Sequence, residues 1–294
     1  MTLTEKKIGF IGTGVMGKSM ALNLQRAGYF INIYTRTKEK ADDLINQGAV
    51  WKESIKDLAA ESDIIITMVG YPSDVEEVYF GESGILEHAK ARSYIIDMTT
   101  SKPSLATEIF KQAKAKNIHA LDAPVSGGDI GAQKGTLAIM IGGEEDAYEA
   151  LLPLFKILGE NIILQGPAGA GQHTKLANQI TIASNMIGVC EAIMYAKRAG
   201  LDPIRVLESI TTGAAGSWSL TNLGPRMIQG DFEPGFYVKH FIKDMTIALE
   251  SAKEIGLDTP GLSLSLEMYK ELAGHGDNDS GTQALIKLFE IQNL

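Results

Sequence analysis

A glycine-rich turn near the amino terminus most tightly limits what this chain can fold into. Gly12, Gly14 and Gly17 have the spacing Gly-x-Gly-x-x-Gly, which alone is weakly diagnostic in a chain that contains 31 glycines. The turn follows the apolar run KKIGFI and opens the helical pattern VMGKSMALNLQRAG. In that context the first glycine makes a tight turn, the second admits a pyrophosphate, and the third lets the helix pack on the strand. We therefore predict a dinucleotide site formed by Gly12, Thr13, Gly14, Val15, Met16 and Gly17.

The first half of the chain alternates short apolar runs with helical patterns. The runs predict strands at 7–11, 30–34, 63–69, 94–98, 118–121, 136–141 and 162–164. The helical patterns between them cover 14–27, 38–47, 74–79, 103–116 and 144–158. Such alternation is typical of an α/β fold with a parallel, doubly wound sheet of the Rossmann type.

The second half has a different pattern. After the Gly/Pro-rich stretch 166–171, residues 172–198 contain no proline and one glycine, which predicts a single helix of about 40 Å at 1.5 Å per residue. Further helical patterns cover 203–210, 238–255 and 261–271. We predict a dinucleotide-binding domain over residues 1–165 and an all-helical domain over 166–294 that begins with this long interdomain helix.

Composition excludes several classes of partner. The net charge of −9, without a block of like charges, argues against nucleic acid or an anionic membrane surface. The least charged stretch, 176–190, is interrupted by Asn178 and Gln179, so we expect a buried helix and no membrane span. The single cysteine, Cys190, suits a reducing compartment, and the amino terminus lacks the apolar segment of a secretory signal. The expected location is cytoplasmic, and no metal site is predicted.

The end of the second predicted strand indicates which dinucleotide binds. An acidic residue there would bind the ribose 2′-hydroxyl of NAD, but the run ends in Arg36, Thr37 and Lys38. Arg36 would stack on adenine and, together with Thr37 and Lys38, pair with a 2′-phosphate. The alternative is that Arg36 and Lys38 are a solvated helix start. We predict a preference for NADP(H), with NAD(H) possible.

Two further segments carry candidate chemistry. Ser126, Gly127 and Gly128 lie in a segment with six glycines between 122 and 143, which would form an anion-binding cradle or simply a tight turn. Lys175 shares a helix face with Asn178 and Gln179 by the spacing i, i+3, i+4. A lysine in such a place is a candidate proton donor, or a surface residue with only its stem buried.

A basic cluster near residue 240 is more ambiguous. Phe236, His240 and Lys243 fall on one predicted helix face, and Asp244 follows directly. His240 would be a structural histidine or a site residue. Lys243 would contact a ligand or form a plain ion pair with Asp244.

Four blocks in a fixed order give the chain a resemblance to a known family. They are GFIGTGVMG at 9–17, DAPVSGGDIGAQKGTLAIMIGG at 122–143, GAGQHTKLANQ at 169–179 and KDM at 243–245. Together they resemble the β-hydroxyacid dehydrogenase family, which includes 3-hydroxyisobutyrate dehydrogenase and tartronate semialdehyde reductase, over nearly the whole chain. The resemblance implies oxidation of a small 3-hydroxy acid, or reduction of its semialdehyde, by a homodimer or homotetramer.

The resemblance also implies roles for individual residues. Lys175 matches the catalytic lysine that acts as general acid and base. Ser126, Gly127 and Gly128 would hold the substrate carboxylate, and Asn178 and Gln179 would orient the substrate. Besides the glycine turn, the cofactor would contact Arg36, Met68, Val69, Thr99 and Lys243, and the segment 212–218 would close the substrate pocket.

The chain departs from the family pattern at three places. Thr35 stands where many members have Asn, Val69-Gly70-Tyr71 replaces the commoner Leu-Pro, and Asn178-Gln179 replaces Asn-Asn. The Asn-Gln pair is similar to the tartronate semialdehyde reductase branch. Alternatives on the same fold are a decarboxylating enzyme of the 6-phosphogluconate type, an imine reductase, and a non-catalytic dinucleotide-sensing module. The chain is short for the first, and Lys175 speaks against the second.

Overall fold

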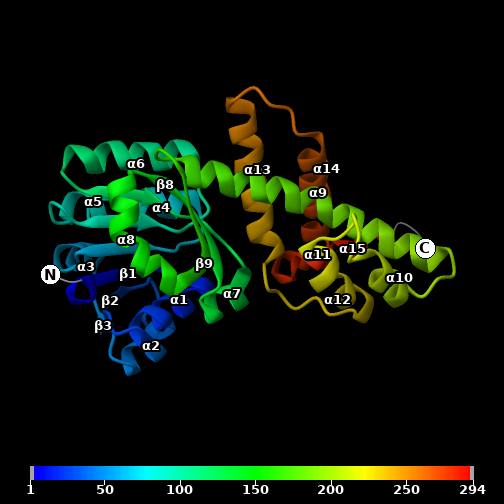
Figure 1. Ribbon diagram of the computed structural model, residues 1–294, viewed down its shortest axis with the longest axis horizontal. Coiled ribbons are helices and arrows are strands. Elements are labelled where there is room, and N and C mark those ends of the chain that lie inside the picture. Colours follow the sequence, from blue (N-terminus) through cyan, green and yellow to red (C-terminus); the bar gives the residue numbers. More distant parts are fainter. Residues whose placement is uncertain (1–2, 292–294) are drawn as a thin grey trace. The chain divides into compact units, whose positions relative to one another are not determined.

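The computed structural model describes residues 3–291, and its first half is built on one nine-stranded sheet (Figure 1). The strand order is β3-β2-β1-β4-β5-β6-β8-β7, with β9 paired to β8. The strands are β1 (Lys7–Ile11), β2 (Phe30–Tyr34), β3 (Val50–Trp51), β4 (Ile64–Thr67), β5 (Tyr94–Asp97), β6 (His119–Asp122), β7 (Val125–Ser126), β8 (Leu137–Gly143) and β9 (Gly159–Gly166).

Two apolar cores lie on the two faces of this sheet. Ile64 and Ile66 belong to one core and Ile65 to the other, because successive side chains of a strand point to opposite faces. A sheet buried on both faces needs strands that are apolar at every position, which explains the continuous run III in β4.

Helices cover both faces and are labelled in Figure 1. The first core is shared with α1 (Val15–Arg26), α2 (Asp42–Asn46), α7 (Gly128–Lys134) and α8 (Glu145–Leu158). The second is shared with α3 (Ile55–Glu61), α4 (Pro72–Phe80), α5 (Ile85–His88) and α6 (Pro103–Ala115). Short 3₁₀ helices cover Leu3–Glu5 and Lys38–Ala41. The predicted doubly wound α/β fold of the Rossmann type is confirmed.

The prediction of a purely parallel sheet is wrong at one edge. Strands β1 to β6 are parallel, whereas β8 runs antiparallel to both β6 and β7. The chain turns back through the short β7 and α7, and neither element has enough residues to show a periodic apolar pattern. The same reason explains why β3, α3 and α5 were not predicted.

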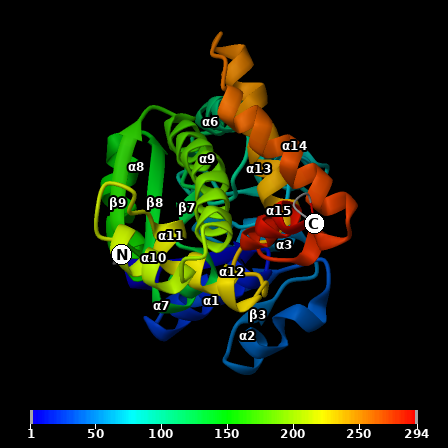
Figure 2. The same cartoon turned by 90° about the vertical axis from the view of Figure 1, so that its right-hand side faces the viewer.

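The second half is helical, as predicted. Helix α9 (Ala170–Arg198) runs past the point at which the chain divides into two compact units, one up to Lys175 (the N-terminal unit) and one from Leu176 onward (the C-terminal unit). In the C-terminal unit, α13 and α14 run side by side (Figure 2) and share one apolar core with α9. Its other elements are α10 (Pro203–Ile210), α11 (Trp218–Asn222), α12 (Gly224–Gln229), α13 (Val238–Glu254), α14 (Pro260–Gly274), α15 (Ile286–Ile291) and 3₁₀ helices at Asp277–Asp279 and Thr282–Leu285.

The single cysteine lies in this core. Cys190 is buried, and burial raises the pKa of its thiol far above the usual range, so the reactive thiolate is suppressed. Across residues 3–291, no helix is long and apolar enough to cross a bilayer. Within the same residues, no group of His, Cys, Asp and Glu is arranged to hold a metal ion.

Candidate functional site

The glycine turn between β1 and α1 has the geometry that a bound pyrophosphate needs. Gly12 has a φ of +97°, and a Cβ there would lie 2.2 Å from the Met68 carbonyl oxygen. A Cβ on Gly17 would lie 2.0 Å from the Gly12 carbonyl oxygen, so the helix packs on the strand only without one. Around Gly14, by contrast, a Cβ would meet nothing within 4 Å. The turn is closed by protein at its two ends and open at its middle glycine.

The ends of β4 and β5 lie beside this turn. The backbone N–H of Val69 donates to Thr99 Oγ1 at 3.0 Å, which ties together two predicted cofactor contacts. The buried hydroxyl of Thr13 has no hydrogen-bond partner among residues 3–291. A buried hydroxyl without a partner is costly, and a ligand phosphate would satisfy it. These residues therefore fit a nicotinamide dinucleotide.

The basic residues after β2 are held by specific partners. The Arg36 side chain is 77% exposed, and its Nη1 lies 3.2 Å from Asp74 Oδ1. Lys38 Nζ lies 5.5 Å from the centre of the Trp51 ring, which stacks on Tyr34. Both residues are exposed, so a solvated helix start stays an alternative, although each cation also has a neighbour that orients it.

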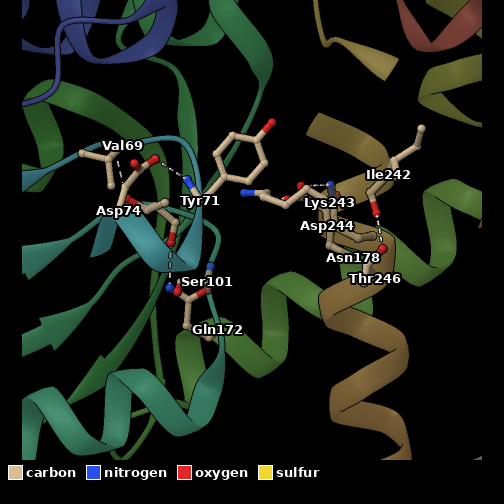
Figure 3. A network of polar contacts seen from close by, with 12 residues as sticks. Val69, Tyr71, Asp74, Ser101, Gln172, Asn178, Ile242, Lys243, Asp244 and Thr246 are labelled. Atoms are coloured by element: carbon tan, nitrogen blue, oxygen red, sulfur yellow. Dashed lines mark hydrogen bonds and ion pairs between the residues drawn. The ribbon is translucent and has the colours of Figure 1, made fainter. Parts of the chain in front are cut away.

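The departure at Val69-Gly70-Tyr71 becomes the start of α4. Tyr71 is the N-cap of this helix and Pro72 its first residue. The Tyr71 N–H donates to Asp74 Oδ2 at 3.0 Å (Figure 3), so the carboxylate that holds Arg36 also caps the helix. Both interactions fix the loop that begins with the predicted cofactor contact Val69.

Two carboxylates are buried at the ends of neighbouring strands. Asp97 ends β5 and Asp122 ends β6, and the two residues are paired in register. Burial raises the pKa of Asp97 to about 6, and the charge of the nearby Asp122 also raises it. Hydrogen bonds from Thr67 and Thr99 oppose this rise. Burial likewise raises the pKa of Asp122, while backbone N–H groups including those of Gly169 and Gln172 oppose that rise.

The raised pKa of Asp97 predicts a pH-dependent stability. The folded state binds the proton more tightly than the unfolded chain, so the contribution of Asp97 is fully present below about pH 4 and is lost as the pH rises through about 6. The variant Asp97→Asn keeps an oxygen that accepts from Thr67 and Thr99 and carries no charge. We expect its free energy of unfolding, relative to wild type, to rise by about 2–3 kcal/mol between pH 4 and 7.5 in urea titrations. A difference that stays constant with pH would contradict this account.

The predicted anion cradle is the turn from β7 into α7. Ser126 ends the strand, and Gly127 and Gly128 have φ values of +133° and +63°. Residues with a Cβ rarely adopt such φ values, so the backbone conformation of this turn requires glycine at both positions. The segment is thus a tight turn, and its backbone geometry is compatible with a cradle.

Lys175 lies in the second turn of α9 and is buried. Only 6% of the residue is exposed, so the alternative of a surface lysine is wrong. Thr174 beside it is half-buried, and Leu176 belongs to the apolar core of the C-terminal unit. A buried lysine is unusual, and such residues concentrate at functional sites.

Four polar residues of the C-terminal unit are joined by two hydrogen bonds and one ion pair. Asn178 Nδ2 donates to Gln179 Oε1 at 2.8 Å, and Gln179 Nε2 donates to Asp244 Oδ2 at 2.6 Å. Lys243 Nζ lies 3.0 Å from Asp244 Oδ1 (Figure 3); the Asp244 side chain is buried, and 11% of the Lys243 side chain is exposed. The fold therefore joins two predicted blocks, 169–179 and 243–245, and the ion pair expected for Lys243 is present. Its contact with a cofactor stays a prediction.

His240 lies one turn before this ion pair. Its ring meets that of Tyr237 edge-on, at 5.8 Å between centres. Burial, followed by the charges of Lys243 and Lys239, lowers the pKa of its imidazole. The ring is therefore neutral at pH 7, which agrees with a structural histidine.

Three residues have roles in this architecture that were not predicted. The Asp122 carboxylate binds the first turn of α9, Gln172 ties that turn to the loop after β5, and Asp244 joins Gln179 to Lys243. The sequence indicated Asp244 only as a partner of Lys243, and it indicated Asp122 and Gln172 only as members of the four blocks. The segment 212–218, predicted to close a pocket, is the loop before α11, where Ser217 Oγ accepts from the Leu220 N–H as an N-cap.

Two sequence families match the chain. Residues 7–166 match the NAD binding domain of 6-phosphogluconate dehydrogenase, and residues 169–289 match the NAD-binding domain of NADP-dependent 3-hydroxyisobutyrate dehydrogenase. The chain is 49% identical to a probable 3-hydroxyisobutyrate dehydrogenase-like protein of Arabidopsis thaliana, covering 100% of this chain and 88% of that protein. It is 41% identical to the 2-hydroxy-3-oxopropionate reductase of Escherichia coli, covering 97% of each.

A solved structure has the same architecture. It is the Mycobacterium tuberculosis 3-hydroxyisobutyrate dehydrogenase with L-serine, which superposes with a TM-score of 0.90 at 29% identity. The match covers 98% of this chain and 99% of that one.

Proposed function

Since the chain belongs to the β-hydroxyacid dehydrogenase family of oxidoreductases, we propose that it interconverts a small 3-hydroxy acid and its semialdehyde. The observation that carries the proposal is the burial of Lys175 at the start of α9, one turn before the Asn178–Gln179 pair. Bound at the glycine turn, a nicotinamide dinucleotide supplies the hydride in reduction and accepts it in oxidation.

Lys175 is the general acid and base of the proposed reaction. In reduction, a carbonyl carbon that gains hydride leaves negative charge on its oxygen, and a protonated amine directed at that oxygen stabilises the charge and donates the proton. In oxidation, the neutral amine accepts the hydroxyl proton.

The remaining residues orient the substrate. Ser126, with the backbone of Gly127 and Gly128, holds its carboxylate. Asn178 contacts the substrate, and Gln179 fixes the Asn178 amide, since Gln179 is buried and bonded on both sides. The relatives suggest the substrates to test first, which are 2-hydroxy-3-oxopropionate, 3-hydroxyisobutyrate and L-serine.

A panel assay tests the proposal directly. Oxidation of NADPH and NADH is followed with tartronic, methylmalonic and succinic semialdehydes and with a cyclic imine. Reduction of NADP⁺ and NAD⁺ is followed with 3-hydroxyisobutyrate, glycerate and L-serine. Turnover with at least one small acid is expected. If the protein binds the dinucleotide but turns over no compound of the panel, a non-catalytic dinucleotide-sensing module is favoured. Turnover of the cyclic imine alone would favour an imine reductase. The family's named dehydrogenases and reductases make both alternatives less favoured.

We propose that NADP(H) is preferred over NAD(H), and that Arg36 causes the preference. Its guanidinium would pair with the 2′-phosphate in addition to Asp74. Arg36→Ala is expected to lower kcat/KM for NADPH by about 10–100-fold and to leave that for NADH nearly unchanged. Lys40→Ala, an exposed cation on the same segment, is the control and should change neither value. A wild-type kcat/KM for NADH at or above that for NADPH would refute the preference.

The quaternary state is part of the proposal. We expect a homodimer or homotetramer, on the resemblance to the family. Light scattering of the purified protein measures the mass of the particle in solution directly. The mass of a single chain would exclude a homodimer or homotetramer.

A further inference from the structure

We propose that Asp122 is a positioning residue for Lys175, acting through the first turn of α9. The proposal rests on the role of Lys175 proposed above. Asp122 ends β6, is 4% exposed, and is separated from the start of α9 by nearly fifty residues. Its carboxylate binds Gly169 and Gln172, neither of which is predicted to contact the substrate.

The Asp122 carboxylate acts as the cap of α9. Oδ1 accepts from the Gly169 N–H at 2.7 Å, and Oδ2 accepts from the Gln172 N–H at 2.8 Å. The first N–H groups of a helix have no partner within it, and a carboxylate there also compensates the positive end of the helix dipole. Since α9 begins at Ala170, these two bonds tie its first turn to the end of β6.

Two glycines make room for this contact. A Cβ on Gly142 of β8 would lie 2.5 Å from Asp122 Oδ1, and a Cβ on Gly171 would lie 2.8 Å from Oδ2 and 2.4 Å from the Met140 carbonyl oxygen. The close contact between Asp122 and the start of the helix is therefore possible only because these two residues lack a Cβ. This explains the glycines at 142 and 171 in the blocks 122–143 and 169–179.

Gln172 provides a second tie between the same turn and the sheet. Its Oε1 accepts from the Ser101 N–H at 2.9 Å (Figure 3), and its Nε2 donates to the Thr99 carbonyl oxygen at 2.7 Å. Gln172 is fully buried. The start of α9 is thus bound to the loop after β5, which contains the predicted cofactor contact Thr99.

Lys175 follows Gln172 by three residues, so its Cα moves with the anchored turn. Replacing one carboxylate oxygen of Asp122 by an amide NH₂ sets a donor against the N–H of either Gly169 or Gln172 and removes the charge. Displacement of a reacting group by about 1 Å can cost 100-fold in rate. The expected consequence is a loss of proton transfer at Lys175 with little change in binding of the dinucleotide.

A double-mutant cycle tests this. Asp122→Asn should lower kcat by about 10–100-fold, with the Kd for NADPH, measured by fluorescence titration, unchanged within about twofold. In the Lys175→Ala background, Asp122→Asn should change the residual kcat by less than about twofold, because the lysine through which it acts is gone. Equal losses in both backgrounds, or no loss in either, would overturn the positioning role.

Controls separate this proposal from general stability and from the proposed function. Asp202→Asn makes the same chemical change at the cap of α10, where Oδ1 accepts from the Ile204 N–H, and should leave kcat unchanged. If Lys175→Ala keeps full turnover, the proposed function itself fails, whatever Asp122→Asn does. If Asp122→Asn does not fold, Gln172→Met replaces it in the same cycle, with the same expected coupling to Lys175.

Discussion

Replacing Lys175 by alanine should lower kcat for the best semialdehyde by about 10²–10⁴-fold, while the Kd for NADPH stays within about twofold of wild type. The variant removes the group that protonates the developing alkoxide and leaves the glycine turn intact. Steady-state kinetics gives kcat, and fluorescence titration of the dinucleotide gives Kd. Small primary amines added to the variant should restore part of the activity, because they supply the missing proton donor in solution.

A second lysine of the same helix is the matched control. Lys197, in the last turn of α9, is partly exposed and paired with Glu290 at 3.0 Å. Lys197→Ala should leave kcat within about twofold of wild type, since an exposed ion pair contributes little. Unchanged turnover in Lys175→Ala would remove the lysine from the mechanism. If Lys175→Ala instead weakens NADPH binding and leaves kcat unchanged, Lys175 belongs to the cofactor site.

Two alanine substitutions in the glycine turn should have opposite consequences. At Gly14 a Cβ meets no protein atom within 4 Å, and the φ of −68° suits alanine, so the melting temperature should be unchanged. The added methyl instead occupies the space expected for the pyrophosphate. The Kd for NADPH should therefore rise about tenfold or more.

At Gly17 the same change places Cβ 2.0 Å from the Gly12 carbonyl oxygen. Both atoms belong to or are attached to the backbone, so the clash cannot be relieved by a side-chain rotation. Gly17→Ala should destabilise the fold by about 1–3 kcal/mol, measured by urea unfolding without ligand. Each variant serves as the control for the other. An unfolding free energy lowered equally in both, or an NADPH affinity unchanged in Gly14→Ala, would refute the assignment of the turn.

Local patterns predicted the elements whose signals are contained in their own residues. In residues 15–26 apolar residues recur every three or four positions, as in an amphipathic helix. The helix predicted over 14–27 differs from α1 by one residue at each end. The predicted 238–255 agrees with α13 to the same precision. Short elements failed, since β7 has two residues and α7 seven, too few for a periodic pattern to appear. The antiparallel direction of β8 depends on that short excursion and was not predictable.

The candidate residues divide in the same way. Lys175, Asn178 and Gln179 were identified because helical spacing puts them on one face. Asp244 was taken only as a neighbour of Lys243, and its bond to Gln179 joins positions 65 residues apart. Asp122 shows the same limit, because its carboxylate caps a helix that begins far along the chain.

The sequence by itself determined the α/β order, the glycine turn, the long helix and the family, since each depends on residues close together in the chain. Only the tertiary structure decided that Lys175 is buried, that Arg36 pairs with Asp74, and that Asp122 anchors α9. The physical reason is one of range. Turn and helix preferences act over a few residues, whereas burial, capping by a distant carboxylate and buried ion pairs exist only once separate segments have packed together.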